Sequence, residues 1–191
     1  TIEKLAKGKT GRIAIVCDDL MRPTPTHVVV PHIVKELNEA GISDNQIFIL
    51  GATGAHPQMT LDSFARKLGW GMVARFDCVS HNPWQNFVDL GLTQRRTPLL
   101  INKEFVKADL RIGVSGIKHH GNAGAGGGGK IVLPGVSSLQ AIVWNHTYVR
   151  YKYGSGEDAD STVGIWNIKD NEARSDMQEA ARTANLNISL N

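Results

Sequence analysis

The sequence lacks several features that would place it in a specialised class of proteins. Its 191 residues include only two cysteines, Cys17 and Cys78, whose wide spacing forms neither a CxxC motif nor a disulfide framework. No apolar run approaches the roughly 18 residues that a membrane span needs. Neither charge is in large excess, since 21 basic and 18 acidic residues leave a net charge of +3. We therefore expect reduced thiols, a cytoplasmic location, and no binding to membranes or nucleic acids.

What the sequence does contain is enough apolar material for one domain, arranged as strands that alternate with helices. Hydrophobic residues make up 41% of the chain, which suffices for a single domain with its own core over residues 1–191. Short apolar runs without alternation are typical of strands buried on both faces. We expect strands at residues 12–17, 46–50, 76–80, 109–115 and 186–191. We expect helices at residues 26–40, 60–68, 102–107 and 170–184.

This alternation predicts an α/β fold with a doubly wound, mostly parallel sheet and helices on both faces, as in three-layer Rossmann-like proteins. Ligands of such sheets bind beyond the carboxyl ends of the strands. Asp19 and Arg22 follow the first strand, His56 follows the second, and His120 follows a later one. The sequence therefore predicts that these polar side chains share one edge of the sheet. The segments that we expect to be irregular are residues 82–98 and 148–164.

A glycine-rich stretch lies between a histidine pair and a lysine. Six of the nine residues 121–129 are glycine, and Lys130 follows them. Glycine loses more backbone freedom on folding than other residues, so such a run is costly. The usual reason for it is close approach of the backbone to a ligand, or amides that point at an anion. We interpret the run as a cofactor cradle. The glycines that we expect at the cofactor are Gly126, Gly127, Gly128 and Gly129.

Two phosphate-binding motifs match the glycine run only in part. Residues 124–130 fit the G-x-x-x-x-G-K pattern, but Ile131 stands where a P-loop needs serine or threonine for magnesium. Residues 124–129 also fit G-x-G-x-x-G, yet Pro134-Gly135 ends any following helix after about one turn. A nucleoside triphosphatase and a nicotinamide-dependent enzyme are therefore both disfavoured.

Lys130 and three histidines could carry chemistry near this run. Lys130 precedes the apolar residues 131–133, so we expect it to be half-buried; it could hold a ligand covalently or extend to solvent. His120 and His146 could be acid/base groups or metal ligands, while His119 would point the other way in an extended segment. A zinc site of His119, His120 and His146 would lack the carboxylate or cysteine that usually completes such a set.

Asp19 and Arg22 form a second candidate group. They could make a surface ion pair of little energetic value. A proline-stiffened loop at a strand end is also a suitable place for an arginine that binds a carboxylate. The histidines without an expected role are His27 and His32, on a helix surface, and His81, in a loop. The tryptophans expected in the core or at a contact between domains are Trp70, Trp84, Trp144 and Trp166.

Over nearly its whole length, the chain resembles the N-terminal domain of the nickel-dependent lactate racemase family. Residues 19–23 (DLMRP) resemble the family's D-x-T-R-P segment, with Met21 where threonine is usual. Residues 54–60 resemble its G-x-H-R-x-x-T segment, with Pro57 in place of arginine.

The most specific part of the resemblance is the spacing of three side chains around the glycine run. His120, Lys130 ten residues later and His146 sixteen residues further resemble the family's H…GG-x-K…LPGV…H pattern. Residues 133–136 supply the LPGV segment. Ala125-Gly126 replace the usual Phe-Ser pair.

The resemblance implies a nickel pincer cofactor, a mononucleotide derived from nicotinic acid. The lysine that matches Lys130 holds it as a thioamide, and the histidine that matches His146 binds the nickel. Two sulfurs and a ring carbon of the cofactor would complete a roughly square-planar site. The glycine amides would cradle the cofactor near its phosphate.

The resemblance also implies an isomerase that acts on a small 2-hydroxy acid. His56 and His120 match the family's acid/base pair. One of them takes the proton of the 2-hydroxyl while hydride leaves C2 for the cofactor, and the other serves the opposite enantiomer. Arg22 would bind the substrate carboxylate, and Asp19 would position the arginine or the cofactor.

Further partners follow from the resemblance. Family members carry a second, C-terminal domain, and this chain ends on the strand that would lead to it, so we expect that domain to be absent here and the isolated domain to be inactive. Proteins that make and insert the cofactor are also implied. The substitutions at Pro57 and Ala125 suggest a substrate other than lactate. The alternative is a non-catalytic module whose glycine run binds a phosphate-bearing or nucleotide metabolite.

Overall fold

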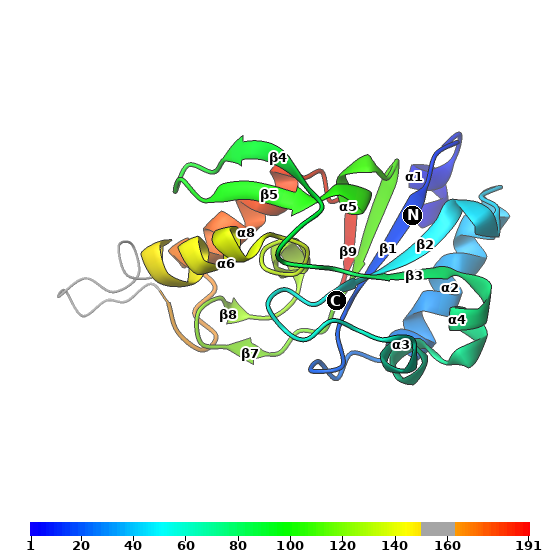
Figure 1. Ribbon diagram of the computed structural model, residues 1–191, viewed down its shortest axis with the longest axis horizontal. Coiled ribbons are helices and arrows are strands. Elements are labelled where there is room, and N and C mark those ends of the chain that lie inside the picture. Colours follow the sequence, from blue (N-terminus) through cyan, green and yellow to red (C-terminus); the bar gives the residue numbers. More distant parts are fainter. Residues whose placement is uncertain (150–162) are drawn as a thin grey trace.

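A parallel sheet forms the centre of the protein in the computed structural model, which describes residues 1–149 and 163–191 (Figure 1). Its five strands lie in the order β3-β2-β1-β6-β9 and are all parallel. The strands are β1 (Ile13–Asp18), β2 (Ile47–Ala52), β3 (Asp77–Ser80), β6 (Leu110–Val114) and β9 (Ile188–Leu190). The predicted doubly wound α/β fold is confirmed.

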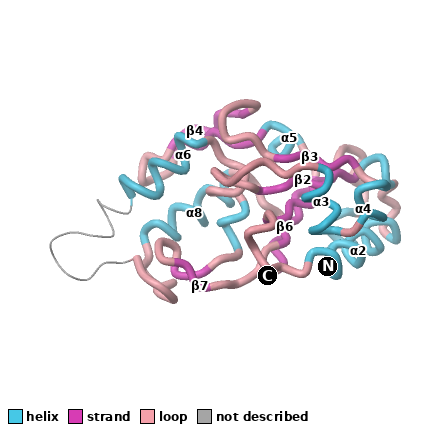
Figure 2. The backbone as a smooth tube through the Cα atoms, turned by 60° about the horizontal axis from the view of Figure 1, so that its bottom comes forward, coloured by secondary structure: helices cyan, strands magenta, loops and turns pink. Residues whose placement is uncertain are grey.

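Helices cover both faces of this sheet, on opposite sides in Figures 1 and 2. The helices of the first face are α1 (Ile2–Ala6), α2 (Thr26–Glu39), α3 (Leu61–Leu68) and α4 (Trp70–Arg75). Those of the second face are α5 (Lys103–Lys107), α6 (Leu139–Val143), α8 (Glu172–Thr183) and the short 3-10 helix η2 (Gly128–Ile131). A further 3-10 turn, η1 (Asp44–Gln46), precedes β2.

The two cores explain why the strands read as continuous apolar runs. Ile13, Ile15 and Cys17 of β1 enter the core under α2 and α3, whereas Ala14 and Val16 enter the core under α8. Successive side chains of a strand point to opposite faces, so a strand covered on both faces needs apolar residues at every position. Every residue of β1 and of β2 is buried.

Side-chain caps begin several of the helices. The Thr60 side chain accepts a hydrogen bond from the amide of Ser63 and begins α3, and Gly69 ends it with a φ of +89°. Asn102 caps α5 and Asn171 caps α8 in the same way as Thr60. Side-chain oxygens at these positions satisfy amides that have no partner within the helix. Each of the described helices is too short or too polar to cross a membrane.

The prediction that residues 82–98 are irregular is wrong. An antiparallel hairpin of β4 (Phe87–Leu92) and β5 (Pro98–Asn102) occupies much of this segment. No residue of β4 is fully buried, so β4 lacks the apolar run on which the prediction depended. The alternating Leu99 and Ile101, both fully buried, are the signal that could have revealed β5. Of the segment predicted to be irregular at 148–164, residues 150–162 lie outside the described part.

Three of the four tryptophans lie outside the core. Trp70 is 67% exposed, Trp84 74% and Trp166 57%, so none of these three belongs to the core. A contact with another domain stays a prediction. Trp144 is partly buried and donates its indole N–H to the carbonyl of Arg95.

A buried carboxylate ties the hairpin to α8 and to the π-helix η3 (Trp144–Val149). Asp176 of α8 is fully buried. It accepts hydrogen bonds from the hydroxyls of Thr93 and Thr97 at 2.6 and 2.7 Å, and from the amide of Asn145 at 2.7 Å. The Asp176 side chain therefore holds together the hairpin, α8 and η3, which are distant in the sequence.

We expect Asp176→Ala to lower the free energy of unfolding by about 3–5 kcal/mol, because buried donors then lack an acceptor. Asp176→Asn is the matched control: it keeps one acceptor oxygen, and a threonine hydroxyl can reverse its role, so its cost should be about 1 kcal/mol. Urea unfolding of the two variants measures the difference. A loss of about 1 kcal/mol or less in both variants would contradict the role of these hydrogen bonds.

Candidate active site

A pocket lies at the carboxyl ends of β1, β2 and β6. The chain winds outward from β1 to β2 and β3, then returns to place β6 and β9 on the other side, so the winding reverses between β1 and β6. Open α/β sheets bind ligands at such a reversal. The pocket has a volume of about 280 Å³. The predicted site residues that line it are Asp19, Arg22, His56, His120, Gly126, Gly127, Lys130 and His146.

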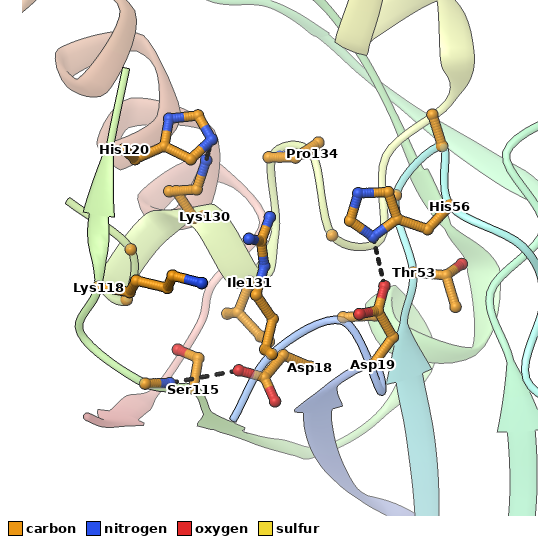
Figure 3. A pocket seen from close by; sticks show the side chains of 18 of the residues that line it. Asp18, Asp19, Thr53, His56, Ser115, Lys118, His120, Lys130, Ile131 and Pro134 are labelled. Carbon is orange, nitrogen blue, oxygen red and sulfur yellow. Dashed lines mark hydrogen bonds and ion pairs between the residues drawn. The ribbon is translucent and has the colours of Figure 1, made fainter. Parts of the chain in front are cut away.

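His56 and Asp19 form a hydrogen-bonded pair on one side of the pocket (Figure 3). The turn after β2 presents His56, since Gly54 adopts a φ of +56° there and donates its amide to the carbonyl of Gly135. His56 Nδ1 lies 2.6 Å from a carboxylate oxygen of Asp19, which is buried. A carboxylate only accepts, so Nδ1 carries the proton and Nε2 is the basic nitrogen of the neutral ring.

The resemblance offered Asp19 a contact with the arginine or with the cofactor, and the second of these stays a prediction. Within the described residues no ion pair joins Asp19 to the guanidinium of Arg22; the two residues share only a backbone hydrogen bond from the Arg22 amide to the Asp19 carbonyl, at 3.1 Å. The second hydrogen bond to the Asp19 carboxylate comes from the amide of Met21, at 2.9 Å. Asp19 therefore orients His56.

His120 lies on the opposite side of the pocket from His56 (Figure 3). It stands in a two-stranded hairpin of β7 (His119–His120) and β8 (Gly124–Ala125). Its Nδ1 accepts the amides of Asn122 and Ala123, each at 3.2 Å. In the neutral ring the proton must therefore be on Nε2, which lies 3.2 Å from Lys130 Nζ. His119 also borders the pocket but is exposed.

The contact between His120 and Lys130 requires a neutral amine. An Nε2–H group can donate to the lone pair of an amine, whereas an ammonium has no acceptor. Burial, followed by the charges of Arg22 and Arg174, lowers the pKa of Lys130 to about 7. Burial, followed by the charges of Lys130 and Arg22, lowers the pKa of His120 to about 4. Lys130 is half-buried, as the sequence predicted.

His146 lies in the π-helix η3 and lines the same pocket. Its Nδ1 is 3.0 Å from the carbonyl oxygen of Ile142. The carbonyl can only accept, so Nδ1 carries the proton and Nε2 is left as the nitrogen with a lone pair. Ligating histidines commonly have this tautomer, and single turns of π-helix are frequent at functional sites.

The glycine run divides into two parts with different roles. Gly126 and Gly127 line the pocket. Gly128 and Gly129, although described, are not among its lining residues; a Cβ at Gly129 would lie 2.5 Å from the carbonyl of Met177 in α8. Gly129 thus approaches the backbone of the protein's own helix, whereas a Cβ at Gly128 would meet the side chain of Gln178. A contact of these two glycines with a cofactor stays a prediction.

The pocket also contains residues that the sequence analysis did not single out. Asp18 and Thr53 lie at the ends of β1 and β2, and Ser115 follows β6. Lys118 is exposed, and in Figure 3 its ammonium group points into the pocket. Their position at strand ends is the signal that could have identified the first three.

No set of three or more histidine, cysteine, aspartate or glutamate side chains within the described residues is arranged to hold a metal ion. His119, His120 and His146 therefore do not form a zinc site by themselves. A metal at this pocket would need donors beyond the described side chains of the protein.

His81 is buried rather than being an ordinary loop residue. Its Nε2 donates to the carbonyl of Ser137 at 2.9 Å, and its Nδ1 faces the amide of Asn102 at 3.3 Å. Burial lowers the pKa of His81 to about 4, and the hydrogen bond to Ser137 opposes this only in part. His81 thus joins the end of β3 to Ser137 and to Asn102.

We expect His81 to make folding sensitive to acid. The unfolded ring binds a proton near its usual pKa of about 6.5, whereas the folded ring does so near 4. The stability from the neutral ring is therefore complete above about pH 6.5 and lost as the pH falls toward 4, by on the order of 3 kcal/mol. Urea unfolding at several pH values should give a shallower pH dependence for His81→Gln. An identical dependence would contradict this assignment.

Comparisons with known proteins identify similar chains. Residues 1–157 match a sequence family described as the lactate racemase N-terminal domain. The lactate racemases of Lactiplantibacillus plantarum and Thermoanaerobacterium thermosaccharolyticum are 35% and 33% identical to the chain over its whole length. The chain spans 43% of each of these relatives, less than half of their length.

Solved structures give the same result. The lactate racemase apoprotein from Thermoanaerobacterium thermosaccharolyticum superposes with a TM-score of 0.85 at 33% identity, over 97% of this chain and 43% of that one. A crystal structure of a protein from Thermotoga maritima superposes with a TM-score of 0.74 at 22% identity, over 95% of this chain and 46% of that one. The second similarity supports the fold alone.

Proposed function

The chain belongs to the lactate racemase N-terminal domain family, and from that premise we propose that it carries the acid/base and cofactor-binding residues of a 2-hydroxyacid racemase or epimerase. The relatives are named as racemases, which are isomerases. The observation that carries the proposal is the convergence of His56, His120, Lys130 and His146 on one pocket.

Arg22 would bind the carboxylate of a small 2-hydroxy acid. Arg22 lines the pocket. Its planar guanidinium is well suited to bind a carboxylate. With the carboxylate held there, the 2-hydroxyl would lie between the two imidazoles. The substitutions at Pro57 and Ala125 favour a substrate other than lactate.

His56 is prepared to act as a general base. Its Nε2 would take the proton of the 2-hydroxyl, and the imidazolium that forms would be stabilised by the Asp19 carboxylate at Nδ1, 2.6 Å away. His120 would serve the opposite enantiomer from the other side of the pocket. In the present geometry Nε2 of His120 carries a proton, so the ring must change its tautomer before it can act as a base. Conversion of the Lys130 amine into the thioamide would remove the lone pair that accepts this proton.

Two side chains of the pocket support the proposal of the nickel pincer nucleotide that the resemblance implies. Lys130 offers a neutral amine for the thioamide linkage, and Nε2 of His146 offers a lone pair for nickel. The nucleotide would supply the remaining donors to the nickel. Bound there, this group would supply the hydride-accepting centre that inversion at C2 needs.

The proposal includes partners. The chain spans 43% of the length of its curated relatives, and we propose that a C-terminal domain completes the substrate site. Cofactor biosynthesis and insertion proteins would load Lys130. A cytoplasmic location would suit the half-buried thiol of Cys78.

Production of the full-length protein together with cofactor-making enzymes tests the proposal. We expect a mass adduct on the peptide that contains Lys130, bound nickel, and racemisation in a screen of 2-hydroxy acids. A folded protein with neither adduct nor nickel would contradict it. If inorganic phosphate or a nucleotide still bound after Lys130→Ala, the non-catalytic binding module would be favoured.

A further inference from the structure

A buried lysine outside the pocket holds the loop that carries Arg22. The ammonium of Lys67, in α3, lies 2.8 Å from a carboxylate oxygen of Asp18 and donates to the backbone carbonyl of Arg22 at 2.8 Å. The side chains of Lys67 and Asp18 are only 4% and 11% exposed. Desolvating two charges costs several kcal/mol, and an apolar pair of similar volume is often as stable. The pair therefore calls for a reason other than stability.

Asp18 attaches the same loop at a second point. It closes β1, and its other carboxylate oxygen accepts the hydroxyl of Thr24 at 2.5 Å and the amide of Gly116 at 3.3 Å. Thr24 lies two residues after Arg22, and Gly116 follows β6. The ion pair thus joins α3, the Arg22 loop and the strand ends beside the pocket.

The guanidinium of Arg22 depends on this backbone for its position. Arg22 lines the pocket. Within the described residues its side chain makes no hydrogen bond or ion pair that would fix it. The position of the loop therefore determines where the guanidinium can reach. Lys67 holds this loop by its hydrogen bond to the carbonyl of Arg22.

We propose that Lys67 is a positioning residue for carboxylate binding: with Asp18 it fixes the Arg22 loop so that the guanidinium meets a carboxylate in the pocket. The inference rests on the proposed function, since Arg22 is taken there as the substrate anchor.

The test uses the full-length protein and a charge-neutral double substitution, Asp18→Asn with Lys67→Met. Lys67→Met alone would leave a buried carboxylate unpaired and could unfold the protein; the double variant removes both charges at nearly constant volume. We expect its thermal unfolding midpoint to stay close to that of the parent. Loss of the Asp18 charge would favour anion binding and loss of the Lys67 charge would disfavour it, so the two electrostatic effects oppose each other in the double variant.

Binding of sodium lactate and of sodium pyruvate to the unloaded protein, measured by calorimetry, gives the first readout. We expect a dissociation constant about tenfold higher in the double variant. In the loaded enzyme KM should rise while kcat changes little. Arg22→Gln should weaken binding in the parent but add almost nothing in the double variant, because both changes act through one guanidinium.

The outcomes separate this inference from the proposed function. If Arg22→Gln weakens binding and the folded double variant binds like the parent, the role of Lys67 is overturned and the proposed function stands. If the two losses add, Lys67 acts independently of Arg22 and the inference is overturned as well. If Arg22→Gln has no effect on either anion, the role of Arg22 fails together with the inference.

Discussion

Asp19→Asn is expected to lower kcat for racemisation by about two to four orders of magnitude in the full-length, cofactor-loaded protein. The carboxylate of Asp19 accepts Nδ1–H of His56 at 2.6 Å and so keeps Nε2 unprotonated. The amide group of an asparagine can donate to Nδ1 instead. That would favour the tautomer whose Nε2 already carries a proton and cannot take one from a hydroxyl. Initial rates at saturating substrate, measured from each enantiomer separately, give the effect.

The direction of racemisation sharpens this test. Because Asp19 contacts His56 and not His120, the enantiomer that uses His56 as its base should lose more than the other in a single turnover. His56→Gln combined with Asp19→Asn should be no slower than His56→Gln alone, since residues that act as a unit do not add. Asp62→Asn, an exposed change of the same charge in α3, is the matched control. Retention of the parent kcat by Asp19→Asn would contradict the base assignment.

The central strands could be predicted because their signal is local. A strand covered on both faces must be apolar at each position, as β1 and β2 are, so its sequence identifies it without knowledge of its neighbours. The hairpin residues 87–92 are partly buried or exposed, so they show no continuous apolar run. The hydrophobic periodicity of one segment also does not show that it pairs with residues 98–102.

For the candidate site, the sequence predicts which residues lie together but not which nitrogen atoms carry protons. Strand ends collect at one edge of a parallel sheet, so the positions of Asp19, His56 and His120 followed from the order of elements. Proton positions did not follow. They depend on distances between side chains and backbone groups, such as the amides of Asn122 and Ala123 against the His120 ring.

Glycines and tryptophans show the same limit. A glycine is required wherever backbone comes close, and the sequence does not tell whether the approaching group is a ligand or a helix. Gly129 meets α8, whereas Gly127 lines the pocket. An indole in a sequence is equally uninformative, since Trp84 is 74% exposed although its type favours burial.

In the unloaded protein, Lys130 is expected to react with an acylating agent with a midpoint near pH 7. Its pKa is about 7, compared with about 10.4 for an ordinary lysine, so roughly a thousandfold more of it is neutral at pH 7. The physical causes are burial, followed by the charges of the nearby Arg22 and Arg174. The contact with Nε2–H of His120 should act in the same direction, because only a neutral amine can accept that proton. Trace labelling with acetic anhydride between about pH 5 and pH 11, followed by peptide mass spectrometry, measures the midpoint. The exposed Lys118, in the same pocket, is the internal reference amine.

Two variants separate the causes of this shift. His120→Phe keeps an aromatic ring over the amine but removes the N–H donor, so the midpoint of Lys130 should rise; if burial alone lowered it, the midpoint would stay where it is or fall further. Lys130→Arg retains a cation but offers no nucleophile, and in the full-length protein it should abolish both the cofactor adduct and racemisation. An ordinary midpoint for Lys130 in the parent protein would mean that the amine is an ammonium in solution. The His120 ring would then have to hold its proton on Nδ1, against the amides of Asn122 and Ala123, and the assignment of both groups would fail together.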